Sequence, residues 1–129
     1  MTRGWAVLFA ATGALWAVTA WFLPAWWASP AFGRTGLNLN VMGLLWAYSA
    51  AVLGTFATQQ PLRLPVVVSG VVAYAWPTVA CGVSIVWFTV EENNVAAIGS
   101  AVAWLGLGLS AATRLVDLLR LASAFRAGE

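Results

Sequence analysis

The sequence predicts an all-α integral membrane protein, a bundle of four transmembrane helices with an amphipathic C-terminal extension. Of its 129 residues, 62% are hydrophobic and 8% are charged, whereas an ordinary soluble domain carries about 25% charged residues. The mean hydropathy is +0.86. A chain this small could not hide so much apolar surface from water, so its solvent is predicted to be lipid.

The apolar residues fall into four continuous runs, each near the roughly 20 residues that cross a hydrocarbon core. The runs do not alternate as strands of a membrane barrel would, and they are rich in Ala and Leu, which favours helices. The predicted spans of this single membrane domain are Trp5–Leu23, Asn40–Thr58, Pro65–Phe88 and Val95–Thr113.

The first span follows Arg3 and ends near a Val-Thr-Ala triplet, as a signal peptide might. Its apolar core is longer than the usual signal core, so we expect a retained helix that acts as an uncleaved signal anchor.

The link between the first two spans, residues 24–39, is predicted to be an outer turn in the headgroup layer. Pro24 and Pro30 stop helical continuation, and Asn38 or Asn40 is suited to cap the second helix. The docking candidates in this turn are Trp26, Trp27, Phe32 and Arg34. An interfacial turn is favoured, and a lid or docking surface is the alternative.

The third and fourth spans are separated by Glu91, Glu92 and two asparagines. Acidic and amide side chains stabilise helix N-termini, so we expect Glu91, Glu92 and Asn93 to cap the fourth helix. Pro77, inside the third span, cannot donate to the carbonyl of Ala73, and we expect a kink there.

The tail, residues 114–129, has an apolar stripe with charges opposite it. The stripe consists of Leu115, Leu118, Leu119, Ala122 and Phe125. The predicted cytoplasmic anchor consists of Arg114, Asp117, Arg120 and Arg126. Asp117 lies three residues from both Arg114 and Arg120, which allows local ion pairing. An interfacial anchor is favoured over partner docking.

Arginine gives the orientation, because the chain has no lysine. With four spans, five of the six arginines share one side with both termini, and only Arg34 lies opposite. The positive-inside rule then predicts cytoplasmic N- and C-termini, in a membrane that we expect to be the bacterial inner membrane.

Each span places one tryptophan within about 5 Å of its midpoint at a rise of 1.5 Å per residue. A buried indole N–H needs an acceptor, and Thr12, Thr19 and Ser49 lie near enough along the chain to supply one. The possible pocket for a lipophilic ligand consists of Trp16, Trp46, Tyr74, Trp76, Pro77, Thr78 and Trp104. Packing opposite small residues, or exposure to lipid, is favoured, with one or two of the four rings facing inward.

The residue inventory excludes most catalytic chemistry. There is no histidine and only one cysteine, Cys81, so the usual haem ligand, the usual acid–base group and a cysteine metal cluster are missing. No charged residue lies centrally in a span, where proton- or ion-coupled transport needs one. We therefore expect no enzyme activity, no cofactor and no metal.

Small residues recur at four-residue spacing, as in Gly99 and Ala103, which permits close helix packing in lipid. The expected function is a non-catalytic accessory or stabilising subunit of a larger bacterial membrane complex. The alternative is a small binder or transporter of lipophilic molecules that uses the tryptophan layer. The expected partners are the bilayer and other membrane subunits or further copies of the chain, and no nucleic acid.

Overall fold

A computed structural model of the chain describes residues 3–28, 32, 38–58 and 61–127, without the side chains of residues 125–127. Within these residues the fold is entirely helical. The long helices are α1 (Gly4–Phe22), α2 (Leu39–Ala57), α3 (Leu64–Glu92) and α4 (Ile98–Ala127), and two short 3₁₀ helices are η1 (Pro24–Trp27) and η3 (Val95–Ala97). All four long helices have the length and hydropathy needed to cross a membrane.

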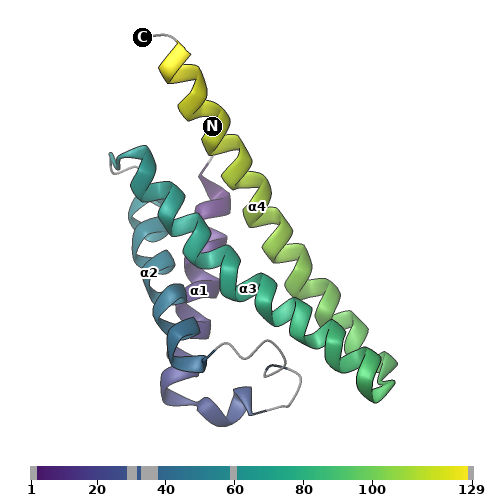
Figure 1. The fold of residues 1–129 in the computed structure, drawn as a ribbon. Coiled ribbons are helices and arrows are strands. Elements are labelled where there is room, and N and C mark those ends of the chain that lie inside the picture. Colours follow the sequence, from purple (N-terminus) through teal and green to yellow (C-terminus); the bar gives the residue numbers. More distant parts are fainter. Residues whose placement is uncertain (1–2, 29–31, 33–37, 59–60, 128–129) are drawn as a thin grey trace.

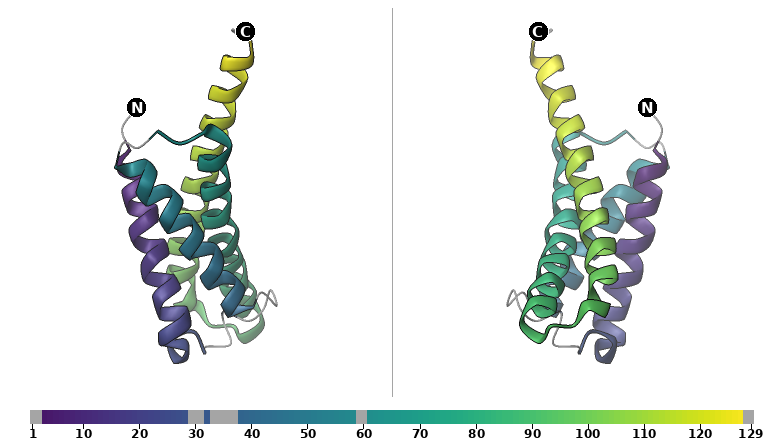
Figure 2. Two further views of the ribbon diagram at one scale, coloured as in Figure 1. Left: turned by 90° about the vertical axis from the view of Figure 1, so that its left-hand side faces the viewer. Right: turned by 90° about the vertical axis from the view of Figure 1, so that its right-hand side faces the viewer.

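Consecutive helices run in opposite directions and pack on one another (Figure 1). The beginning of α1, the end of α2 and the beginning of α3 lie at one end of the bundle, which we call the arginine end. Helix η1 and the α3–α4 link lie at the opposite end, which we call the aromatic end (Figures 1 and 2). The last turns of α4 extend beyond the other helices at the arginine end (Figures 1 and 2).

The predicted spans agree with α1 and α2 to within one residue at each end. The amphipathic extension is also helical, since α4 continues without a break to Ala127. Leu118 of the predicted stripe is buried, but Leu119 is 50% exposed. The side chains of Phe125 and Arg126 lie outside the described part of the structure.

The expected cap of the fourth helix is wrong. Glu91 and Glu92 are instead the last two residues of α3, and Asn93 ends that helix with a left-handed φ of 52°. Asn93 donates its backbone N–H to the carbonyl of Thr89. Asparagine tolerates this conformation better than most residues, so it suits a helix C-terminus as well as an N-terminus.

Two polar contacts define the ends of α2. Asn38 accepts a hydrogen bond of 2.7 Å from the backbone N–H of Asn40, which confirms the predicted cap. At the other end, Arg3 Nη1 donates to the carbonyl of Phe56 at 2.6 Å. A cation at a helix C-terminus satisfies a free carbonyl and interacts favourably with the helix dipole. This contact holds the start of α1 against the end of α2.

Glycines allow α3 and α4 to approach closely. A Cβ atom at Gly108 would lie 2.5 Å from a methyl of Val79 and 3.4 Å from its backbone nitrogen. By contrast, a Cβ at Gly106, two residues earlier on α4, would meet nothing within 4 Å. Packing against Val79 within the chain therefore explains why residue 108 is a glycine, but no contact within the chain explains the glycine at residue 106.

This difference predicts opposite effects of two alanine substitutions on the same helix. Gly108→Ala should lower the free energy of unfolding by about 1–3 kcal/mol, the usual cost of overpacking. Gly106→Ala should raise it by up to about 1 kcal/mol, because alanine is the better helix former. Thermal unfolding of the purified variants in detergent measures both, and equal effects would contradict the packing of α3 on α4.

Candidate functional site

Aromatic rings from all four long helices meet at the centre of the bundle. Trp16 of α1 lies 5.3 Å from Trp46 of α2 and 4.5 Å from Trp104 of α4, centroid to centroid. Tyr74 of α3 stacks on Phe9 of α1 at 4.6 Å. We call this set the aromatic core. It connects helices that are distant in sequence.

The polar atoms of Trp46 and Tyr74 have hydrogen-bond partners on neighbouring helices. Trp46 donates its indole N–H to Thr78 Oγ1 at 3.2 Å, which joins α2 to α3. The same threonine hydroxyl donates to the carbonyl of Tyr74 at 2.6 Å. The Tyr74 hydroxyl shares a hydrogen bond of 2.9 Å with Thr12 Oγ1, which joins α3 to α1. The indole of Trp46 and the phenol of Tyr74 are thus satisfied, whereas the buried indole N–H of Trp5, near the start of α1, has no hydrogen-bond partner among the described residues.

The sequence analysis expected one or two of the four midspan indoles to face inward, and the structure brings three together. Trp16, Trp46 and Trp104 are in mutual ring contact. Trp76 is 65% exposed and lies on the outer face of α3. The four indoles lie near the midpoints of their helices, but only three of them point toward the centre of the bundle.

The other members of the predicted pocket are packed rather than arranged around a cavity. Trp46, Tyr74, Pro77 and Thr78 are all fully buried. Neither of the two hollows described below is lined by any of these four side chains. Around these four residues the aromatic core is closely packed. The binding of a lipophilic ligand there stays a prediction.

A hollow of about 240 Å³ opens at the aromatic end, next to the core. Its lining comes from α1, η1, α4 and the α1–α2 link, and consists of Leu15, Trp16, Thr19, Trp26, Trp27, Phe32 and Trp104. Trp16 and Trp104 therefore belong to both the core and the hollow. We call this hollow the aromatic cup.

Trp27 forms a wall of the cup, although the sequence analysis assigned it to an outer docking surface. Its ring lies 5.3 Å from Trp46 and 5.8 Å from Trp104, and its N–H donates to Thr19 Oγ1 at 3.1 Å. The neighbouring Trp26 is 67% exposed, because consecutive side chains of a helical turn point in different directions. Arg34 and Pro30 lie outside the described residues.

A second hollow, of about 480 Å³, lies along the outer face of α3 beside Trp76. It is lined by Val72, Ala75, Trp76, Val79, Ala80, Val83 and Leu115. All but Leu115 belong to one side of α3, so this hollow is a shallow apolar groove on the surface of the bundle.

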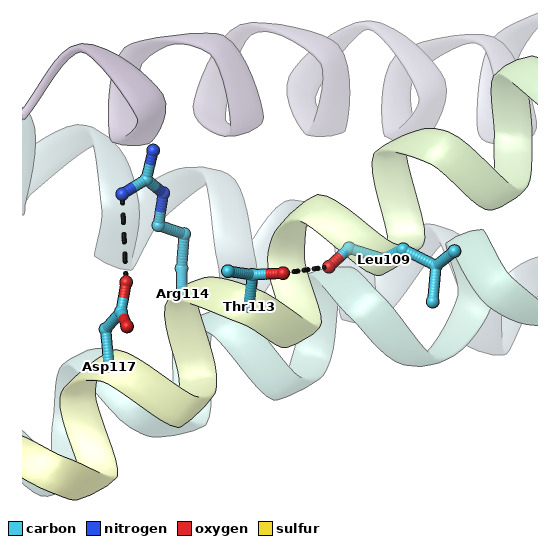
Figure 3. Close-up of polar contacts among 4 residues, drawn as sticks. All are labelled: Leu109, Thr113, Arg114 and Asp117. Atoms are coloured by element: carbon cyan, nitrogen blue, oxygen red, sulfur yellow. Dashed lines mark hydrogen bonds and ion pairs between the residues drawn. The ribbon is translucent and has the colours of Figure 1, made fainter.

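The predicted cytoplasmic anchor is partly described. Arg114 Nη1 lies 3.9 Å from Asp117 Oδ2, with both side chains nearly half exposed (Figure 3). The guanidinium of Arg114 also lies 5.9 Å from the ring centroid of Trp5, which places this part of α4 beside the start of α1. An exposed ion pair such as Arg114–Asp117 contributes about 0–1 kcal/mol to stability. Arg120 is exposed at the same end of the bundle.

Within the described ranges, no group of three or more histidine, cysteine or acidic residues could hold a metal ion. Cys81 is buried, with its Sγ 3.8 Å from the sulfur of Met42. A buried thiol among apolar residues is a packing group rather than a reactive one.

Comparison with known protein families, with curated proteins and with solved structures finds no match for this chain. Its function must therefore be argued from its own geometry.

A sequence signal does exist for the direction of Trp76. The buried face of α3 carries most of its small and polar residues, including Gly70, Tyr74, Thr78 and Gly82, spaced at three or four residues. Trp76 is two residues from Tyr74 and therefore about 200° around the helix. No comparable signal existed for Trp27, because it lies outside the long helices.

The hydrogen bond between Trp46 and Thr78 can be measured by a double-mutant cycle. Trp46→Phe and Thr78→Val should each destabilise the fold, and their combination should be less harmful than the sum, by about 0.5–1.5 kcal/mol. The reason is that either change alone already removes the bond. The measurement is equilibrium unfolding in detergent.

Thr113→Val is the matched control, because its hydroxyl donates only to the carbonyl of Leu109 on the exposed side of α4 (Figure 3). Its effect should be small and additive with Trp46→Phe. Additivity of Trp46→Phe and Thr78→Val would show that the bond between them does not stabilise the fold.

Proposed function

We propose that this chain is a non-catalytic integral membrane protein, an accessory or stabilising subunit of a larger bacterial membrane complex. Four helices long and apolar enough to cross a membrane support the membrane part of the proposal. The bacterial inner membrane is proposed from the use of arginine without lysine and the abundance of Ala, Gly and Trp.

One observation supports the subunit role most directly: α4 has an apolar face that its own chain does not cover. Only 17% of its apolar window is buried inside the protein, against 50% for α3. The exposed face includes Gly99, Ala103 and Gly106. Glycine weakens a helix unless a close neighbour makes use of its small size. A helix of another membrane protein would supply that neighbour.

The distribution of charge supports cytoplasmic termini. Arg3, Arg63, Arg114 and Arg120 belong to the arginine end, whereas Glu91 and Glu92 are at the opposite end of α3. Arginine is retained on the cytoplasmic side of bacterial membrane proteins. The proposed orientation therefore places the aromatic cup at the outer surface.

A second candidate function is the binding of lipophilic molecules. The aromatic cup supports it, because five of its described lining side chains are aromatic.

The orientation can be tested with reporters fused after Glu129. A reporter that works only in the cytoplasm should be active, and one that works only in the periplasm should be inactive, because the arginine end stays inside. The reverse pattern would contradict the orientation and would move the cup to the cytoplasmic side.

The subunit role can be tested by site-specific photo-crosslinking in cells. A photoreactive residue at Ala103 should give one discrete crosslinked product with another membrane protein. The same residue at Leu8, an exposed apolar position on α1, should give only lipid adducts. Gly106→Ile should abolish the product while the thermal unfolding of the purified protein stays unchanged, because Gly106 has no neighbour in its own chain.

A product formed with a second copy of this chain would support an oligomer in place of a complex with other subunits. Lipid adducts alone at both positions would contradict the subunit role.

A further inference from the structure

We propose that the aromatic cup binds a trimethylammonium group, the cationic part of choline and of choline lipids. The inference rests on the second candidate function, binding of lipophilic molecules, and is independent of the subunit role. Four features of the cup lead to it: the arrangement of its rings, its size, its lack of charge and its place in the bundle.

Three rings form mutually inclined walls. Phe32 lies 5.0 Å from Trp27 at an interplanar angle of 63°, and 6.0 Å from Trp104 at 78°. Trp27 and Trp104 are 5.8 Å apart at 59°. Rings inclined in this way form a corner, in contrast to the stacked pair of Phe9 and Tyr74. A corner of aromatic rings presents π-electron density to a group seated in it from more than one direction.

The remaining walls are Trp16 and Trp26, so that five of the lining side chains are aromatic. Among the described lining residues, the one polar side chain is that of Thr19. Its hydroxyl accepts from Trp27 and donates to the carbonyl of Trp16 at 3.0 Å. Thr19 is therefore engaged in holding the walls. Recognition is left to the aromatic rings, whose negative faces attract an organic cation.

The volume of the cup, about 240 Å³, favours a small group. Pockets for drug-sized ligands begin at about 300 Å³, so an entire lipid or pigment would not be enclosed. A trimethylammonium group is compact and weakly hydrated, and it gains from cation–π contact without needing a hydrogen-bond acceptor.

Charge favours a cation over a neutral molecule of the same shape. No charged side chain belongs to the described lining of the cup. Arg3, Arg63, Arg114 and Arg120 lie at the arginine end of the bundle, opposite the cup. An organic cation therefore meets no like charge among the described lining residues, and the negative faces of the rings favour it over a neutral molecule of the same shape.

The experiment compares choline with 3,3-dimethylbutan-1-ol, its neutral isostere, on the full-length protein in maltoside micelles. Binding is followed by saturation-transfer NMR of the ligand methyl groups and by titration of tryptophan fluorescence. Choline should bind about 2- to 5-fold more tightly than the isostere, the difference expected for cation–π contact at a site that opens to the surface.

Trp104→Leu should weaken choline binding by about fivefold or more. Trp87→Leu is the matched control. Trp87 is an exposed tryptophan near the end of α3, and it does not line the cup. It should leave the affinity unchanged.

Trp104 also belongs to the aromatic core, so its substitution could disturb folding. Biosynthetic replacement of tryptophan by its mono-, di- and trifluorinated forms avoids this, since ring shape is kept while the negative face weakens. Choline affinity should fall stepwise with each added fluorine, and the affinity of the isostere should not.

Equal affinity for choline and its isostere, or choline affinity insensitive to fluorination, would overturn the cation site while leaving a binder of lipophilic molecules. Absence of binding of both ligands would overturn the inference and the second candidate function together.

The source of the group is decided in nanodiscs. Discs of phosphatidylcholine and discs of phosphatidylethanolamine with the same acyl chains are titrated with choline. Weaker apparent choline binding in phosphatidylcholine supports the site and identifies a lipid headgroup as its occupant. Equal binding in both discs supports the site and identifies a soluble ligand.

Discussion

The arrangement of this bundle depends on one constraint: a large aromatic ring with a polar atom must find both packing and a hydrogen-bond partner in an apolar medium. Trp46 meets it through Thr78, and Tyr74 meets it through Thr12. Each of these pairs joins two different helices. Because the rings are bulky and their partners are fixed on the facing helices, they determine which helices adjoin and how far apart they lie.

The sequence was sufficient for the number of long apolar helices and for the position of each indole along its helix, because both depend on distance along the chain. Span length follows from bilayer thickness, and depth follows from the helical rise. The direction of a side chain around its helix is a different quantity. In lipid both faces of a helix are apolar, so the periodicity that separates inside from outside in soluble proteins is weak. Trp76 and Trp46 therefore look equivalent in their position along the helix, and only the spacing of small and polar residues on α3 distinguishes Trp76.

The ends of the helices and the short elements were less predictable. Asn93 fits a helix beginning and a helix end equally well by composition, and only the backbone conformation distinguishes them. Trp27 is held by Thr19 and by rings on two other helices. Such a placement arises from contacts made after folding, and local sequence does not encode it. The cup, whose walls come from three helical elements and a link, was beyond sequence reasoning for the same reason.

The left-handed turn at Asn93 also bears on the order in which the protein is assembled. Helices α3 and α4 are joined by a tight connection, whereas a much longer link separates α1 from α2. In the two-stage view of membrane protein folding, helices insert first and associate afterwards. A tight connection keeps α3 and α4 at high effective concentration, which favours their pairing as a hairpin as soon as both helices have formed. The aromatic core needs all four helices, so it forms last. Its formation joins the α1–α2 pair to the α3–α4 hairpin.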